Sequence, residues 1–284
     1  MRGKLRLQGI KATNPVAVGD NVEYKMIDEQ LGQITKVLPR KNHLVRRSTN
    51  LSKKSHVIAA NIDQAILLAT LQSPVTTRVF IDRFLVSAES FGIPVVLIFN
   101  KTDLYTEAEI EELYELEYTY SKVVKAFHAI SAIHESAQEL AVDILKDKIS
   151  VIAGHSGAGK TSFINLADSN LNLKTGNISD YHQSGKHTTS YTEMHSIESG
   201  GYIIDTPGIR AFGINHIEKE ELYHYFPEIF DVSKKCKYYN CLHINEPGCA
   251  VIEAVENGDL SPSRYFSYLN LYEDKGTKHR EVDY

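Results

Sequence analysis

Apolar residues between positions 61 and 204 gather in short continuous runs, separated by segments in which apolar residues recur at helical spacing. Continuous apolar runs are typical of parallel strands that are buried on both faces of a sheet. The alternation of strands and helices therefore predicts an α/β domain. The predicted strands are 62–71, 93–99, 123–130 and 149–153, and the predicted helices cover 78–91, 107–117 and 162–166.

Two local patterns refine this arrangement. The apolar residues of 78–91 fall on one helical face, and Gly92 ends the helix. Residues 191–197 and 201–204 are typical of two strands joined by a hairpin turn. The predicted inner face of the first helix consists of Val79, Phe80, Phe84, Leu85, Ala88 and Phe91.

The two ends of the chain have a different pattern. Residues 16–24 and 32–38 are short β-branched segments separated by turn signals, which favours a small OB-like β-barrel. Near the other end, the sequence predicts a helix over 250–257 and an aromatic-rich segment over 265–269, whose rings we expect in a core. We therefore divide the chain into domains 1–58, 59–214 and 215–284.

Composition and charge narrow the functional classes. The chain has 284 residues, 42% of them hydrophobic and 24% charged, as in globular proteins. No apolar run is long enough to cross a bilayer and the first residues lack a signal-peptide core, so we expect a cytoplasmic protein without a membrane partner. The net charge is −5, yet residues 1–60 carry twelve Lys and Arg against four Asp and Glu.

This basic N-terminal end predicts a polyanionic partner, although a solvated basic face without a partner is the alternative. An OB-like domain often carries oligonucleotides on its open face, so the polyanion would be a nucleic acid. The candidate phosphate contacts are Lys36, Arg40, Lys41, Arg46 and Arg47.

Residues 154–161, Gly-His-Ser-Gly-Ala-Gly-Lys-Thr, lie between a predicted strand and a predicted helix, as a phosphate-binding loop requires. The glycines let backbone N–H groups point at phosphate oxygens, and the helix adds its positive N-terminal dipole. We expect Lys160 on the β- and γ-phosphates and the Thr161 hydroxyl on Mg²⁺. An ordinary glycine-rich turn is the alternative. The predicted nucleotide contacts are Gly154, His155, Ser156, Gly157, Ala158, Gly159, Lys160, Thr161 and Ser162.

The strand over 93–99 is followed by Asn100-Lys101-Thr102-Asp103, which resembles the guanine-reading N-K-x-D motif of GTPases. The carboxylate of Asp103 can accept from both the N1–H and the exocyclic amine of guanine, and adenine offers no such pair. Asn100 would brace the loop and the stem of Lys101 would lie along the base. Ser131-Ala132 resembles the element whose backbone contacts the guanine oxygen. The alternative is that residues 100–103 only cap a helix over 107–117. The N-K-x-D match argues against an ATPase or a kinase.

A second strand end carries Asp205-Thr206-Pro207-Gly208. Asp205 would hold Mg²⁺ through water, and the Gly208 N–H would sense the γ-phosphate. Thr188 or Thr189 would supply a further Mg²⁺ ligand from the polar segment 185–190. The base-reading motif precedes the phosphate loop, the reverse of the usual order in GTPases, so we predict a circularly permuted GTPase domain.

Cys236, Cys241, His243 and Cys249 follow the spacing C-x4-C-x-H-x5-C and include every cysteine of the chain. Three thiolates and one imidazole satisfy tetrahedral Zn²⁺ without an open position. The pattern therefore predicts a structural zinc site, with free buried cysteines as the alternative.

The basic OB-like head, the permuted motifs and the cysteine cluster together resemble the ribosome small-subunit-dependent GTPase family, RsgA or YjeQ. The resemblance implies a monomeric GTPase that binds GTP and GDP, contacts the 16S rRNA of the small ribosomal subunit and acts late in maturation of that subunit, which stimulates it. Relatives usually have a further strand before Arg2–Arg6, so we expect a barrel without its first strand. A GTP-dependent RNA-binding checkpoint, in which hydrolysis only triggers release, is the alternative.

The resemblance also suggests how the attacking water is oriented. Ras-like enzymes use a glutamine directly after the switch II glycine, and here that position is Ile209, which cannot bond water. His187 lies in the match to the family's G-R-H-T-T-T segment. We therefore expect His187 to be catalytic.

Overall fold

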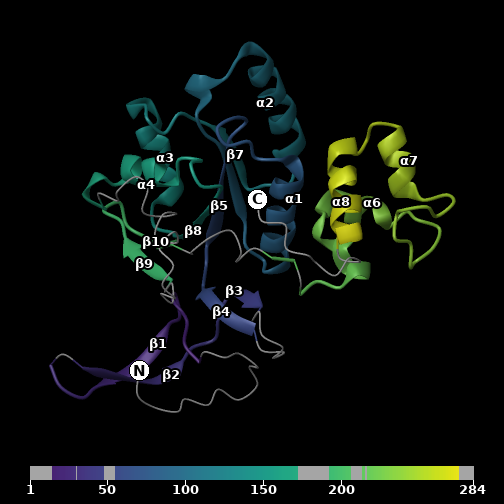
Figure 1. Cartoon of the computed structure of the whole chain (residues 1–284). Helices are drawn as coiled ribbons and strands as arrows, with labels where there is room; N and C mark the ends of the chain where they lie inside the picture. The colour runs from purple at the N-terminus through teal and green to yellow at the C-terminus, as the bar shows by residue number, and fades with distance from the viewer. Residues whose placement is uncertain are drawn as a thin grey trace, which may run out of the picture.

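The computed structural model describes residues 15–29, 31–47, 55–171, 192–205, 213–214 and 216–274 (Figure 1). Of these, the side chains of residues 45–47, 55, 56 and 205 are left out of the description. The chain forms a central α/β domain, a β-rich N-terminal part and a helical C-terminal domain beside it.

A six-stranded sheet with the order β7-β6-β5-β8-β10-β9 forms the centre, and only β9 runs antiparallel to its neighbour. The predicted parallel sheet and the predicted hairpin are both present. Its strands are β5 Gln64–Ala69, β6 Val95–Phe99, β7 Ala126–Ala129, β8 Ile149–Ala153, β9 Glu193–Ser196 and β10 Tyr202–Asp205. The strand predicted from 123 begins later, because the amides of Val123 and Val124 bond to the Tyr120 carbonyl and complete the turn after a helix.

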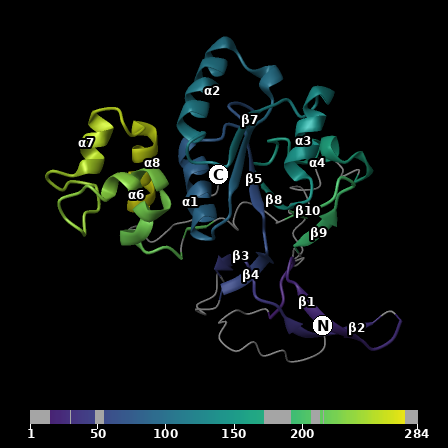
Figure 2. The ribbon, with the colours of Figure 1, turned by 180° about the vertical axis from the view of Figure 1, so that it is seen from behind.

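Helices cover both faces of this sheet (Figure 2). Along β5 successive side chains enter opposite cores, with Leu67 facing α1 and α2 and Leu68 facing α3 and α4. The helices are α1 Arg78–Ser90, α2 Glu107–Tyr120, α3 Gln138–Leu145 and α4 Lys160–Ala167, with short 3₁₀ turns η1 Thr102–Leu104, η2 Glu135–Ala137 and η3 Ser169–Leu171. Thr77 caps α1 and Thr106 forms a capping box with Glu109, which fixes where α1 and α2 begin.

The buried surface of α1 is wider than the single apolar face that the sequence predicts. Phe84 and Leu85 face the sheet as expected, but Asp82 and Val86 are also fully buried. Val86 belongs to the core of the C-terminal domain, so α1 is covered on two sides. Helical periodicity identifies the first face, whereas the second depends on a partner far along the chain.

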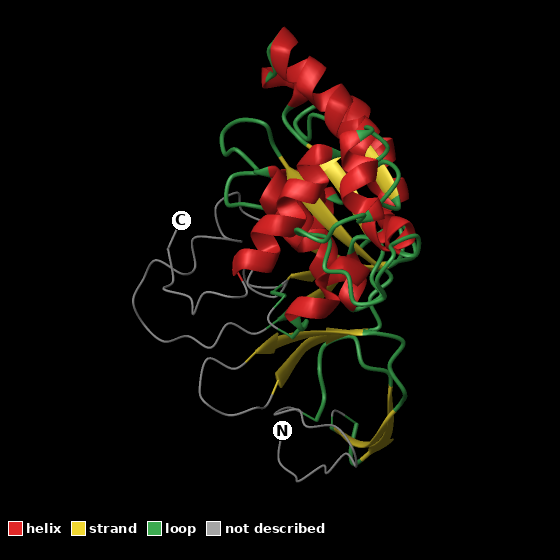
Figure 3. Ribbon diagram, turned by 90° about the vertical axis from the view of Figure 1, so that its right-hand side faces the viewer, coloured by secondary structure: helices red, strands yellow, loops and turns green. Residues whose placement is uncertain are grey.

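The N-terminal part contains two separate antiparallel pairs: β1 Val22–Met26 with β2 Gly32–Val37, and β3 His43–Arg47 with β4 Ser55–Ala60 (Figure 3). An isolated bridge joins Val18 to Ala59. The segment predicted from residue 16 becomes a strand only at Val22, since the Asp20 carboxylate accepts the Ala17 amide in a turn. The described residues do not show a closed OB-barrel, which stays a prediction.

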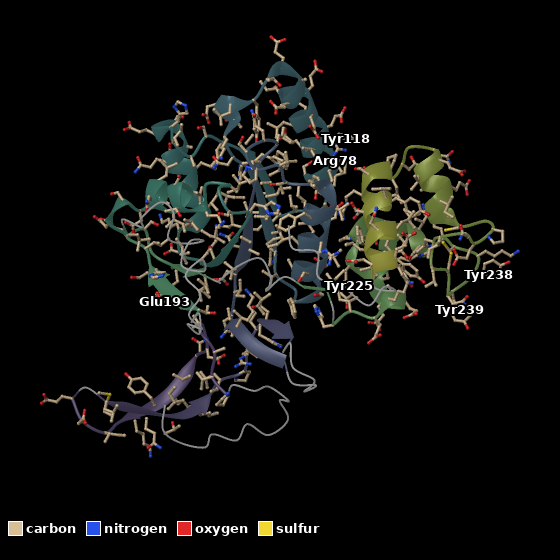
Figure 4. All side chains as sticks on the ribbon, in the orientation of Figure 1. Arg78, Tyr118, Glu193, Tyr225, Tyr238 and Tyr239 are labelled. Atoms are coloured by element: carbon tan, nitrogen blue, oxygen red, sulfur yellow. The ribbon has the colours of Figure 1, made fainter. Side chains whose placement is uncertain are left out.

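The C-terminal domain consists of η5 Lys219–Tyr225, α6 Pro227–Ser233, α7 Ala250–Glu256 and α8 Pro262–Asp274. As expected, aromatic side chains build its core, and Tyr268 and Phe226 are fully buried. Tyr238 and Tyr239 lie at its outer end, away from the sheet (Figure 4). Among the described residues, no helix combines the length and apolar character needed to cross a membrane.

Candidate nucleotide site and metal centre

The predicted nucleotide motifs meet at one edge of the sheet. Strands β6, β7, β8 and β10 are all parallel to the sheet's direction, so their carboxyl ends lie at the same edge. The residues 100–103, 131–132 and 154–161 follow β6, β7 and β8, and Asp205 is the last residue of β10. This is the edge at which open α/β sheets bind ligands.

The phosphate loop has the backbone conformation that its glycines predict. Gly157 and Gly159 have φ values of 82° and 94°, in the left-handed region. Helix α4 begins directly after Gly159, at Lys160. The Lys160 ammonium donates to the carbonyls of Gly154 (2.9 Å) and His155 (2.8 Å), which holds it across the loop.

Asn100 connects three of the predicted motifs. Its side chain is 2% exposed, and its Nδ2 donates to the Ala158 carbonyl of the phosphate loop at 2.8 Å. Its Oδ1 accepts from the Ala132 amide at 2.9 Å. The Asn100 side chain therefore joins the base-reading loop, the Ser131-Ala132 element and the phosphate loop. Both of its buried polar atoms have a hydrogen-bond partner.

The base-reading residues are arranged by their own short contacts. Lys101, the N-cap residue directly before η1, has φ of 67°, and its ammonium donates to the Ser73 carbonyl. The Ser131 hydroxyl donates to Oδ1 of Asp103. This hydrogen bond fixes the carboxylate of an exposed residue and leaves acceptor capacity for a ligand.

Two contacts that stabilise the nucleotide-binding edge of the sheet were not predicted from the sequence. The Tyr105 hydroxyl donates to the Asn100 carbonyl (2.6 Å) and accepts from the Leu71 amide (3.1 Å), and burial raises the pKa of Tyr105 to about 12. The ring of Phe80, in the first turn of α1, lies 4.3 Å from the ring of His155. The bond from Leu71 to Tyr105 and the packing of Phe80 on His155 have no local sequence signal, because each joins segments that are distant in the chain.

Tyr105→Phe is expected to lower the free energy of unfolding by about 1–3 kcal/mol, because it leaves the Leu71 amide and the Asn100 carbonyl without their partner. We expect GTP and GDP affinities to fall together, since the base-reading loop is common to both. Thermal melts and nucleotide titrations measure this. Tyr114→Phe on α2, at a residue 66% exposed, is the matched control, and equal effects of the two changes would contradict the assignment.

The four predicted zinc ligands converge in the C-terminal domain. Their ligand atoms all lie within 4.8 Å of one another. Nδ1 of His243 is 3.5 Å from Sγ of Cys236 and 3.4 Å from Sγ of Cys249, and these two sulfurs are 3.9 Å apart. A tetrahedral zinc ion requires edges of about 3.6 Å for sulfur to nitrogen and about 3.8 Å for sulfur to sulfur. The cluster therefore fits a metal of this kind.

The residues around the cluster fix its loop. The Glu246 carboxylate accepts from the amides of Leu242 (2.9 Å), Ile244 (2.8 Å) and Asn245 (3.1 Å). Burial alone would raise the pKa of Glu246, but the backbone hydrogen bonds outweigh burial, and the pKa lies below its ordinary value. The Tyr265 hydroxyl donates to the His243 carbonyl at 2.7 Å. The aromatic segment thus holds the ligand loop from α8.

Comparison with known proteins gives the family of this chain. The sequence model described as "RsgA GTPase" matches residues 37–215. The chain belongs to the RsgA GTPase family. Members of this family hydrolyse GTP, which they bind with Mg²⁺, so the chain is a GTPase.

Curated relatives match this RsgA GTPase over most of its length. It is 50% identical to "Small ribosomal subunit biogenesis GTPase RsgA 2" of Bacteroides thetaiotaomicron, with 97% of this chain and 89% of the relative covered. It is 45% identical to the protein "Small ribosomal subunit biogenesis GTPase RsgA" of Flavobacterium psychrophilum, with 99% and 87% covered.

Two solved structures share the fold of this RsgA GTPase. The structure of YjeQ from Thermotoga maritima has a TM-score of 0.78 at 37% identity and covers 98% of this chain and 89% of its own. The structure of "YloQ, a circularly permuted GTPase" has a TM-score of 0.73 at 29% identity and covers 98% and 87%. These likenesses bear out the prediction of a permuted GTPase domain.

Several predicted site residues of this RsgA GTPase lie outside the described residues. They are His187, Thr188, Thr189, Gly208 and the side chain of Asp205. Their predicted roles stay predictions. The described part of the site holds the base-reading motif and the phosphate loop.

The predicted RNA contacts need one correction. Arg40 donates to both carboxylate oxygens of Asp20, at 2.6 and 2.7 Å, and its side chain is 8% exposed. The guanidinium is held in a structural ion pair, so Arg40 is removed from the phosphate contacts. Lys36 and Lys41 pair with carboxylates at 3.3 and 3.2 Å but stay exposed. Arg46 and Arg47 lie on β3, and their side chains are outside the described part.

Proposed function

We propose that this GTPase acts in biogenesis of the small ribosomal subunit, binds that subunit through its rRNA, and is stimulated by it. The names of its relatives, which are small ribosomal subunit biogenesis GTPases, support this role. The observation that carries the guanine-nucleotide site is the pair of hydrogen bonds by which Asn100 joins the phosphate loop to Ala132. A side chain in that position fixes the distance between the base-reading and phosphate-binding ends of one nucleotide.

The base end of the site reads guanine. The Asp103 carboxylate accepts from the N1–H and amine of the base, with the Ser131 hydroxyl holding one of its oxygens. Lys101 lays its stem along the base. The Ala132 amide, which donates to Asn100 Oδ1 in this structure, would be shared with the guanine oxygen when the nucleotide binds. ATP at the concentration of GTP is expected to leave bound GTP in place, and displacement would contradict this assignment.

The phosphate end stabilises the charge of the triphosphate. Backbone amides of residues 154–162 and the Lys160 ammonium contact phosphate oxygens, and the Lys160 side chain already reaches across the loop. Thr161, Asp205 and one of Thr188 or Thr189 hold Mg²⁺, which neutralises developing negative charge. The Gly208 amide contacts the γ-phosphate, and His187 orients the attacking water.

The domains on either side of the GTPase domain bind RNA and a structural metal ion. Residues 1–58 form an OB-like RNA-binding domain in which Lys36, Lys41, Arg46 and Arg47 contact phosphates of 16S rRNA. Residues 215–284 form a domain around one structural zinc ion at Cys236, Cys241, His243 and Cys249. Residues 59–214 form the permuted GTPase domain, and the protein acts as a monomer.

Steady-state GTP turnover with and without purified small subunits tests the proposal. GTPases of this type turn over at roughly 10⁻⁴ to 10⁻² s⁻¹ unassisted, and we expect a rise of about a hundredfold or more on the subunit. His187→Ala is expected to keep GTP affinity and lose most of this rise, because the water is no longer oriented. Both assays need the same salt, since phosphate contacts weaken with salt. Absence of stimulation in the unaltered protein would contradict the proposed role, and full stimulation of His187→Ala would remove that residue from the mechanism.

A further inference from the structure

A single arginine of the C-terminal domain is inserted into the GTPase domain. Arg264, in α8, is 2% exposed, and its Nη1 donates to Oδ1 of Asp82 in α1 at 2.6 Å. Its Nε donates to Oε1 of Glu228 in α6, also at 2.6 Å. One guanidinium therefore bonds a carboxylate from each of the two domains.

Aromatic rings close the guanidinium off from water. Its carbon lies 4.7 Å from the ring centre of Phe226, in the C-terminal domain, and 5.7 Å from that of Tyr120, at the end of α2. Asp82 is fully buried, and burial raises its pKa while the charge of Arg264 lowers it. A lone charge at this position would be strongly unfavourable, so each group depends on the other.

Helix α1 carries this ion pair next to its contacts with the nucleotide site. Phe80, two residues before Asp82, packs against His155 of the phosphate loop. At the other end of α1, Ser90 Oγ lies 2.8 Å from Nε2 of His216, and Phe91 stacks on the same ring at 4.6 Å. Figure 4 shows Arg78, which begins α1, on the upper part of the helix and Tyr225 of the C-terminal domain near its lower end.

The same helix therefore touches the phosphate loop, the C-terminal domain and the linker that enters this domain after β10. A displacement of the C-terminal domain that α1 follows through the Asp82–Arg264 pair also displaces Phe80, because Phe80 and Asp82 lie within the first two turns of one rigid helix. A cleft lined by Glu89, Lys125, Tyr225 and Arg264 lies beside the ion pair.

We propose that Arg264 is a positioning residue, which couples the placement of the C-terminal domain through Asp82 and α1 to nucleotide retention by the phosphate loop. The consequence for stimulated turnover rests on the proposed function. Nucleotide retention is a property of the chain alone and can be measured without the ribosomal subunit. The proposed coupling and the proposed function can therefore fail independently of each other.

The test uses the double variant Asp82→Asn, Arg264→Met in the full chain. It removes both charges of the Asp82–Arg264 pair, and replacement of a buried pair by uncharged groups often preserves stability. Glu228 loses its partner in this variant, but its side chain is 21% exposed. We expect zinc content and melting temperature close to those of the unaltered protein. We expect release of a fluorescent GDP analogue to become faster by about three- to thirtyfold. Hydrogen exchange of residues 154–160 should accelerate as well.

Arg83→Met is the matched control. Arg83 is the next residue of α1 and pairs with Asp274 of the same helix α8, but the two side chains are 33% and 28% exposed. We expect unchanged GDP release from this variant. Subunit-stimulated turnover should fall in the double variant and persist in Arg83→Met.

A folded, zinc-loaded double variant with unaltered GDP release and exchange would overturn the coupling. The single variant Arg264→Lys adds a second test, since one ammonium cannot reproduce the fork that bonds Asp82 and Glu228. We expect an intermediate release rate from it. A rate equal to that of the unaltered protein in both variants would leave Arg264 with a packing role alone and contradict the proposal.

Discussion

Gly159→Ala is expected to weaken binding of both GTP and GDP by about a hundredfold or more. A Cβ added at Gly159 would lie 2.1 Å from Nδ2 of Asn100, and the backbone there has φ of 94°. To relieve the contact, either Asn100 must leave its bonds to Ala158 and Ala132 or the loop must open. Strain and lost hydrogen bonds together cost about 3 kcal/mol or more, or about a hundredfold or more in Kd. Isothermal titration calorimetry with GTP and with GDP measures this change in Kd.

Gly92→Ala is the control for backbone strain. Gly92 also has a left-handed φ, 63°, yet nothing lies within 4 Å of an added Cβ. We expect this change to cost about 1 kcal/mol of stability and to leave nucleotide affinity unchanged. Tight GDP binding by a folded Gly159→Ala protein would show that Asn100 does not define the site.

Cys241→Ser is expected to abolish binding of the proposed zinc ion and to unfold the C-terminal domain. Cys241 is 3% exposed and is one of the four converging ligand residues. Structural zinc binds finger peptides with about 10–16 kcal/mol, which exceeds the stability of most small domains. We expect one zinc per chain to fall to none by elemental analysis. Hydrogen exchange in α6, α7 and α8 should then approach that of an unfolded chain, while β5 and β6 stay protected.

His224→Ala is the control for the loss of an imidazole near the cluster. His224 is exposed, packs edge-on against Tyr223 at 4.2 Å and is not one of the ligands. We expect full zinc content and an intact C-terminal domain. Retention of zinc by Cys241→Ser with unaltered exchange would show that the cluster is not the structural centre of this domain.

The features that the sequence predicted correctly depend on neighbouring residues. Continuous apolar runs gave β5, β6 and β8 because strands buried on both faces are mostly apolar. Gln64 of β5 and Ser150 of β8 are buried polar exceptions, and they bond to each other at 3.0 Å. The phosphate loop was found from its glycines, since the left-handed backbone at Gly157 and Gly159 is a property of the loop itself. The convergence of Cys236, Cys241, His243 and Cys249 was predicted because all four residues lie in one short segment, and their role as zinc ligands stays a prediction.

The tertiary structure decided which distant side chains meet. Arg40 was predicted to contact RNA, but Asp20, twenty residues away, holds its guanidinium. The Asn100 side chain joins a loop 58 residues away, and Asp82 pairs with Arg264 at a separation of 182 residues. No local pattern encodes such pairs, because their strength comes from burial that only the packed domains create. The sequence alone thus determined the chemistry at each strand end, and packing determined how α1 connects that chemistry to the C-terminal domain.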